Sequence, residues 1–169
     1  MSYRPLSLTV TLKTITPLLL GGSNGRDEPD LRPPSFRGAL RYWLRAALGG
    51  VVGDKDISTL RELESAVFGS TDHGSPVRVR LSCFHGQPRT EVVSILPHMS
   101  GVSAGRRKAF AAGQKFDLIM SENGKHEECV WNAACSALML ALTFGGVGLR
   151  SRRGYGTLDV VDSSNPELV

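Results

Sequence analysis

The chain has 169 residues, of which 41% are hydrophobic and 21% are charged. A chain of this length buries roughly 70% of its unfolded surface when it folds as one domain, and this composition excludes wholesale disorder. No apolar run reaches the roughly 18–20 residues that a membrane span needs, and the alternating N-terminus lacks the apolar segment of a secretory signal. We therefore expect one folded, cytoplasmic domain with no membrane partner.

The charge balance favours an anionic partner. Twenty basic and 16 acidic side chains give a net charge of +4, and arginine outnumbers lysine by 15 to 5. The planar guanidinium binds phosphate bidentately and stacks on bases, so an arginine surplus favours nucleic acid. A GC-rich genome also raises arginine content, so the distribution of the arginines matters more than their number.

Cysteine and histidine show no metal-ligand spacing. The three cysteines, Cys83, Cys129 and Cys135, form neither a CxxC pair nor a disulfide framework, and the four histidines form no HxxxH motif. The sequence therefore predicts no metal site and no cofactor. We expect the cysteines to be reduced, buried thiols.

The N-terminal part of the chain predicts a strand, a loop and a helix. Residues 6–13 alternate apolar and polar side chains, as a half-buried strand does. The stretch 18–34 is rich in Gly, Asp and Pro, which predicts a loop. Apolar side chains then recur at helical spacing over residues 36–50, where Ser35 is the expected N-cap and Gly49-Gly50 the expected stop.

The rest of the chain completes an alternation of strands and helices. The pattern predicts, in chain order, a helix at 57–68, a strand at 77–84, a strand or extended insertion at 91–96, a long hairpin connection at 97–114, a strand at 115–120, a helix at 127–144, a glycine-rich turn at 145–156 and a strand at 157–161. This order favours a ferredoxin-like α+β fold, βαββαβ, in which two helices cover one face of an antiparallel sheet and insertions interrupt the motif. We expect a single domain at 1–162 and a C-terminal tail at 163–169.

Two basic clusters lie outside the glycine-rich turn. Arg37, Arg41 and Arg45 are four residues apart on the first predicted helix, so they line one side of it. A solvated helix face explains them equally well, but no acidic residue occurs between positions 33 and 53 to pair with them along the helix. The second cluster, Arg106, Arg107 and Lys108, is expected in a loop that either stays solvated or orders on nucleic acid.

The third cluster, the segment GGVGLRSRRGYG at 145–156, is the most informative. Glycines let the backbone approach a ligand, arginines beside them reach phosphates, and a tyrosine offers a stacking surface for a base. The segment follows a long predicted helix rather than a strand, so it is not a dinucleotide fingerprint. The candidate RNA-binding residues in it are Gly146, Gly148, Arg150, Arg152, Arg153, Gly154 and Tyr155.

Two segments resemble the RAMP superfamily of CRISPR proteins. They are TPLLLGGSNGRDEPDLRPPSFRGALRYWLRA, with its Pro-Ser-x-x-Gly-Ala-Leu-Arg helix start, and FGGVGLRSRRGYGTL. Within the superfamily, the chain is similar to the first-numbered RAMP subunit of the Cmr (type III-B) effector complex. The resemblance implies a ferredoxin-like RNA-binding domain whose glycine-rich loop and basic first helix face RNA. It also implies guide (CRISPR) RNA, target RNA and other RAMP subunits as partners, with no small-molecule substrate.

The same resemblance places the subunit at the end of the complex where the 3′ part of the guide pairs with target RNA, in antiviral defence. Members of that subunit family often carry a second RAMP-like domain, whereas the length of this chain gives room for only one such domain in total.

Catalysis has two candidate origins. Guide-processing RAMP endoribonucleases often use a histidine near the first strand and helix, but residues 1–53 contain none, and His98 is the one histidine worth testing. RAMP backbone subunits cleave target RNA with a loop aspartate and a metal ion, and Asp27 and Asp30 occupy such a loop. Loop solubility explains both aspartates without chemistry. We expect a non-catalytic RNA-binding subunit; the alternatives are an RAMP endoribonuclease or a purely structural assembly subunit.

Overall fold

The computed structural model describes residues 4–22, 28–53, 55–96 and 105–165. Its elements, in chain order, are β1 (Ser7–Thr14), α1 (Pro33–Val52), α2 (Ile57–Phe68), β2 (Val77–Leu81), β3 (Thr90–Ser94), β4 (Arg106–Phe110), β5 (Lys115–Glu122), α3 (Glu128–Phe144) and β6 (Leu158–Ser163). The last strand includes Ser163, the first residue of the segment expected as a tail. Among the described residues, no helix is both long and apolar enough to cross a bilayer.

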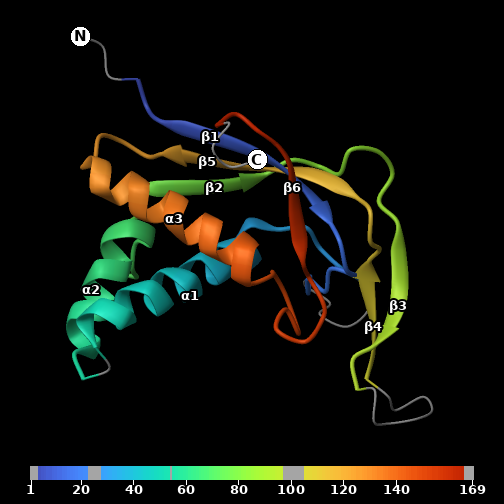
Figure 1. Cartoon of the computed structure of the whole chain (residues 1–169). Coiled ribbons are helices and arrows are strands. Elements are labelled where there is room, and N and C mark those ends of the chain that lie inside the picture. Colours follow the sequence, from blue (N-terminus) through green and yellow to red (C-terminus); the bar gives the residue numbers. More distant parts are fainter. Residues whose placement is uncertain (1–3, 23–27, 54, 97–104, 166–169) are drawn as a thin grey trace.

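The sheet confirms the predicted ferredoxin-like α+β fold. Its four strands are antiparallel in the order β2-β5-β1-β6. With β1, β2, β5 and β6 as the four strands of the βαββαβ motif, the first and third of them, β1 and β5, are central, as this fold requires. Helices α1 and α3 lie side by side on one face, and α2 packs beside α1 (Figure 1). The additional β3–β4 hairpin forms a separate two-stranded sheet at the end of the molecule opposite α2 (Figure 1).

The core lies between the sheet and the helices. Alternate residues of β1 are buried and pair with buried residues of β5, with Leu12 opposite Phe116 in the register. Phe36 of α1 meets the Phe116 ring edge-on at a centroid distance of 5.6 Å. Each such side chain contributes about 1.5–3 kcal/mol when it leaves water, so this packing fixes the position of α1 on the sheet.

The ends of α1 differ from the prediction. The helix begins at Pro33, its N-cap is Arg32 in extended conformation, and Ser35 is not the cap. Proline is tolerated in the first turn because its missing N–H would have no helical partner there. Gly49-Gly50 stay helical, and the helix ends only at Gly53, where φ is 87° and the backbone N–H donates to the Gly49 carbonyl at 3.0 Å.

The predicted loop position of Arg106, Arg107 and Lys108 is wrong, because these residues form part of β4. They pair with Ser94, Val93 and Val92 of β3, respectively. The predicted strand 77–84 is also too long, since β2 ends at Leu81. The chain then turns so that the Phe84 ring packs on Phe110 of β4 at a centroid distance of 4.7 Å, which ties the hairpin to the core.

The cysteines are free, as expected, but none of the three is fully buried. Cys83 and Cys129 are exposed, and Cys135 on α3 is half-buried. Burial raises the pKa of the Cys135 thiol to about 11, so this thiol is protonated at neutral pH and is a poor nucleophile.

Candidate functional site

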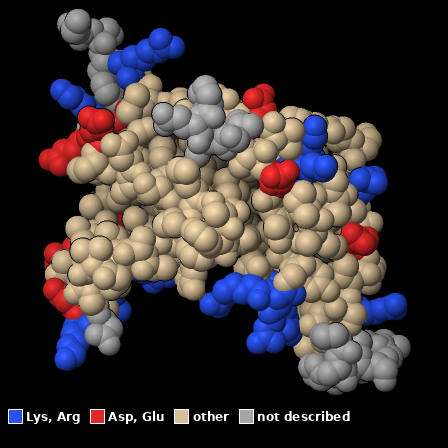
Figure 2. Space-filling model, viewed as in Figure 1, with Lys and Arg blue, Asp and Glu red and all other residues tan. Residues whose placement is uncertain are grey.

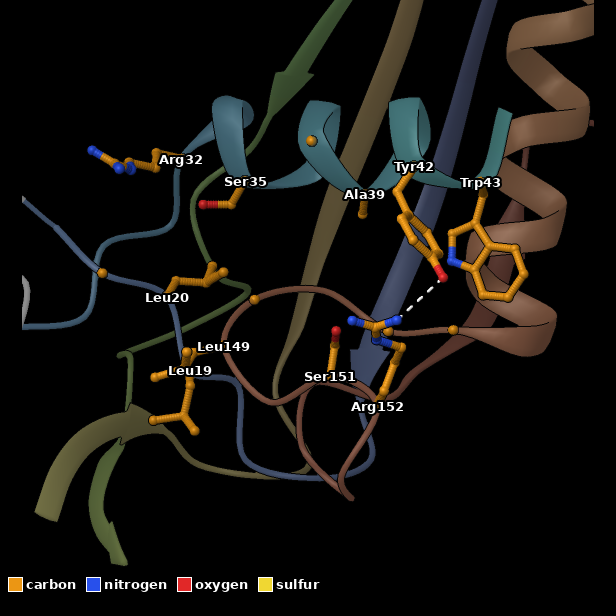
Figure 3. A pocket seen from close by; sticks show the side chains of 15 residues that line it. Leu19, Leu20, Arg32, Ser35, Ala39, Tyr42, Trp43, Leu149, Ser151 and Arg152 are labelled. Atoms are coloured by element: carbon orange, nitrogen blue, oxygen red, sulfur yellow. Dashed lines mark hydrogen bonds between the residues drawn. The ribbon is translucent and has the colours of Figure 1, made fainter. Parts of the chain in front are cut away.

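A groove of about 480 Å³ runs between the N-terminal half of α1 and the segment 145–156 (Figure 3). The helix lines it with Ser35, Gly38, Ala39, Tyr42 and Trp43. The other walls are Leu19, Leu20, Gly21, Arg32, Gly145, Gly146, Gly148, Leu149, Ser151 and Arg152. Among the described residues, two arginines and no acidic side chain line the groove, so its charge suits an anionic ligand.

Segment 145–156, which we call the glycine-rich loop, is held by backbone hydrogen bonds. The Gly156 N–H donates to the Pro17 carbonyl at 3.0 Å, and the Leu149 N–H donates to the Leu19 carbonyl at 2.9 Å. Within the loop, the Val147 N–H donates to the Gly156 carbonyl at 2.9 Å. The loop therefore rests on the chain that leaves β1, and its position is fixed before any ligand binds.

Two of its glycines combine this close backbone packing with a positive φ. Gly148 has φ 92° and Gly156 has φ 68°, both in the left-handed region. A Cβ at Gly148 would overlap the Leu19 carbonyl oxygen, and one at Gly156 would overlap the Val147 carbonyl oxygen. Gly154 differs, because its φ is 84° but a Cβ there would meet no atom within 4 Å. The sequence suggested that these glycines let the backbone approach a ligand. At Gly148 and Gly156 they instead let two segments of the backbone pack closely against each other.

The arginines of the loop are available to a ligand. Arg152 and Arg153 are exposed and Arg150 is half-buried, with φ 63°. Within the described part of the chain, no carboxylate forms an ion pair with any of the three. Figure 2 shows basic side chains gathered between the helices and the β3–β4 hairpin, with no acidic side chain among them in this view.

Tyr155 lies away from the groove. Its ring packs with Leu19, Ile95 and Ala109, and its hydroxyl donates to the Ser94 carbonyl of β3 at 3.0 Å. The aromatic side chains that line the groove are Tyr42 and Trp43, which sequence analysis missed. A signal existed: Ser35, Gly38, Ala39 and Tyr42 follow helical spacing, so small side chains and then one aromatic ring share a face of α1.

Arg41 and Arg45 are engaged by α2. The Arg41 Nε forms a hydrogen-bonded ion pair with Oε1 of Glu64, and its Nη2 donates to the Gly69 carbonyl at 2.9 Å. The Arg45 Nε lies 3.2 Å from Glu64 Oε2. The acidic partner that the α1 sequence lacks therefore comes from another helix.

The remaining predicted basic residues are Arg37 on α1 and the cluster on β4. The Arg37 Nε is buried without a hydrogen-bond partner in the described structure, and the side chain lines a second hollow of about 240 Å³ with Pro33, Pro34 and Val79. On β4, Arg106 is exposed, whereas the Lys108 Nζ pairs with Glu28 Oε1 at 2.9 Å. Neither cluster lines the groove, so of the three predicted clusters the structure brings only the glycine-rich loop to it.

Of the residues named for catalysis, the structure describes Asp30 alone. Asp27 and His98 lie outside the described residues. Asp30 is exposed, and within the described ranges no three His, Cys, Asp or Glu side chains are grouped to hold a metal ion. His85 instead pairs with Asp117 at 3.1 Å. Burial acts to raise the pKa of that carboxyl, but hydrogen bonds from Thr11 and His85 outweigh it and hold the pKa below its usual value.

The family model of the RAMP superfamily matches residues 11–159, so the chain belongs to that superfamily. Among its relatives is CRISPR system Cmr subunit Cmr1-1 of Pyrococcus furiosus, with 31% identity over 85% of this chain and 44% of the relative. Subunit Cmr1-2 of the same organism is 29% identical over 88% of this chain and 92% of its own length. The chain therefore spans less than half of one relative and nearly all of the other.

Solved structures show the same fold. The apo crystal structure of Cmr1 from Pyrococcus furiosus has a TM-score of 0.74 and 28% identity over 96% of this chain and 51% of that chain. A chain in the type III-B Cmr-beta complex bound to cognate target RNA has a TM-score of 0.57 and 17% identity over 95% of this chain and 60% of that chain. This chain is thus a Cmr-type RAMP protein, as the two sequence signatures predicted.

Proposed function

We propose that this chain is a non-catalytic RNA-binding subunit of a type III CRISPR RNA-guided effector complex. It binds guide RNA, or the guide–target duplex near the 3′ end of the guide, beside other RAMP subunits in antiviral defence. The observation that carries the proposal is the groove on this RAMP fold, which is lined by Arg32 and Arg152 together with the hydrogen-bonded glycine-rich loop. Among the described residues, neither arginine has an acidic partner. The relatives support it, since both are subunits of a CRISPR Cmr system.

The phosphate contacts are assigned by the availability of each guanidinium. The main phosphate contacts come from the glycine-rich loop, through Arg150, Arg152 and Arg153. In the described structure these three side chains have no carboxylate partner, and backbone hydrogen bonds hold the loop in place. Gly146, Gly148, Gly154 and Tyr155 shape that loop. From β4, Arg106 and Arg107 extend the basic surface. Lys108 contacts a phosphate only when it leaves its ion pair with Glu28. Arg37, Arg41 and Arg45 contribute least, because Arg41 and Arg45 must leave Glu64 to reach a phosphate.

Salt dependence tests this assignment. Fluorescence anisotropy with a single-stranded RNA of about 40 nucleotides is expected to show a log–log salt slope of roughly −3 to −4 if about five phosphates are contacted, at about 0.7 per phosphate. Replacing Arg150 and Arg153 with Ala removes two contacts and flattens the slope by about 1 or more. The control is Arg61→Ala with Arg78→Ala, which removes the same charge from exposed sites outside the glycine-rich loop and leaves the slope near that of the wild type.

The same samples run on a denaturing gel separate the alternatives. Intact RNA with salt-sensitive binding supports the proposal. Cleaved RNA would identify the chain as an endoribonuclease. Cleavage that requires a metal ion would then indicate aspartate chemistry, and cleavage without metal would indicate histidine chemistry. An unchanged slope in the Arg150/Arg153 variant removes the glycine-rich loop from the interface, and no binding at low salt leaves a structural assembly role for the arginines.

A further inference from the structure

Tyr42 presents an exposed aromatic ring at the groove. The residue lies on α1, lines the groove and is 42% exposed. The guanidinium of Arg152 lies over this ring, with Cζ 5.3 Å from the ring centroid. Its Nη1 also donates to the Tyr42 hydroxyl at 3.2 Å (Figure 3). A flat cation from the glycine-rich loop therefore occupies the position that another flat group could take on the same ring.

The orientation of the Tyr42 ring is fixed by its neighbours. Trp43 meets it edge-on, with a centroid distance of 5.5 Å and an interplanar angle of 89°. Trp43 in turn lies close to Phe144, at a centroid distance of 6.2 Å. The indole also packs so tightly on Gly145 that a Cβ there would overlap its Nε1. Since the ring is held in place before a ligand arrives, little conformational freedom is lost on binding.

The chemistry around this ring selects an unpaired nucleobase linked to a phosphate. A purely apolar ligand would leave Arg32 and Arg152 without anions, and a simple anion would leave the Tyr42 face unused. The volume of about 480 Å³ falls within the range of roughly 300–1,000 Å³ that small-molecule groups occupy in proteins. A nucleotide uses both features, because its base stacks on an aromatic ring while its phosphate binds arginine.

We propose that Tyr42 stacks one unpaired base of single-stranded RNA and that Arg152 moves from the ring to the phosphate of the same nucleotide. This inference rests on the proposed RNA-binding function. The exchange is favourable because base–aromatic stacking is stronger than a solvent-exposed cation–π contact, and the guanidinium gains a phosphate in return. Tyr42 is thus the base-stacking side chain of the groove, a role that the sequence suggested for Tyr155.

Two substitutions of Tyr42 and two probes test the proposal. Tyr42→Leu removes the ring, and Tyr42→Phe keeps the ring but removes the hydroxyl that holds Arg152. The probes are a ten-nucleotide oligouridine and a tetrahydrofuran-spacer oligonucleotide with the same number of phosphates and no bases. We expect Tyr42→Leu to weaken oligouridine binding at least 5-fold, within the roughly 5- to 150-fold that one stacked base contributes. We expect Tyr42→Phe to bind at least as tightly as the wild type.

The spacer probe separates stacking from structural damage. With the ring removed, the affinity for the spacer changes less than 2-fold and the salt slope is kept, since the phosphate contacts remain. Leu63→Ala, an exposed apolar site on α2 outside the groove, is the matched control and changes neither affinity.

Three outcomes would overturn the inference. Oligouridine binding that is unchanged in Tyr42→Leu refutes stacking while the proposed function stands. An equal loss on both probes assigns the ring to support of the loop instead. Wild-type protein that binds neither probe in a salt-sensitive way refutes the proposed function and the stacking together.

Discussion

Gly156→Ala is expected to lower the free energy of unfolding by about 2–5 kcal/mol, whereas Gly154→Ala should lower it by about 1–2 kcal/mol. Both glycines have positive φ, 68° and 84°, so both substitutions pay the cost of a left-handed alanine, about 1–2 kcal/mol. A Cβ at Gly156 also overlaps the Val147 carbonyl oxygen, whereas one at Gly154 meets nothing within 4 Å. Forced shifts in a packed site add about 1–3 kcal/mol.

Urea unfolding followed by circular dichroism measures the difference, and RNA affinity shows its consequence. The Val147 N–H donates to the Gly156 carbonyl, so a displaced Gly156 moves both ends of the glycine-rich loop and takes Arg152 away from the groove. We therefore expect Gly156→Ala that remains folded to lose more RNA affinity than Gly154→Ala. Equal unfolding free energies for the two variants would contradict the close packing at Gly156.

Much of the fold could be predicted because its signals are local. The alternation in β1 and the helix stop at Gly69 are readable within a few residues. The strand β4 was missed because its sequence RRKAF has no alternation of its own. Its pairing with β3, such as Val92 with Lys108, joins two separate strands, and such pairing leaves little trace in the sequence of either strand alone.

The glycine-rich loop of the candidate site could be predicted from local sequence, whereas the side chains that pair across elements could not. Arginine beside glycine marks the glycine-rich loop in the sequence, and the loop does line the groove. The aromatic partner could not be chosen between Tyr42 and Tyr155, because the choice depends on the contact of Tyr155 with Ser94 of the hairpin. Likewise, the fate of Arg41 depends on Glu64, which comes from a different helix. Side-chain pairing between elements requires the tertiary structure.

The pairing of Arg41 with Glu64 leads to the second large expected effect, a loss of about 2–4 kcal/mol in unfolding free energy for Arg41→Met. The Glu64 side chain is only 8% exposed, and removing one partner of a buried ion pair leaves an uncompensated charge that costs about 3–5 kcal/mol. Arg45 remains at 3.2 Å and offsets part of that cost. The substitution also removes the donor to the Gly69 carbonyl at the C-terminal end of α2.

A set of variants separates this structural role from RNA binding. Arg45→Met should cost less than about 1 kcal/mol, because that side chain is 51% exposed, and it is the matched control. The double variant Arg41→Met with Glu64→Leu should recover most of the lost stability, since an apolar pair of similar volume can replace a buried ion pair. With stability restored, the salt slope of RNA binding by the double variant shows the role of Arg41. A slope like that of the wild type means that Arg41 only holds α1 and α2 together. A slope flatter by about 0.7 means that Arg41 contacts a phosphate. A double variant as unstable as Arg41→Met would show that the carbonyl contacts, rather than the pair with Glu64, hold the two helices together.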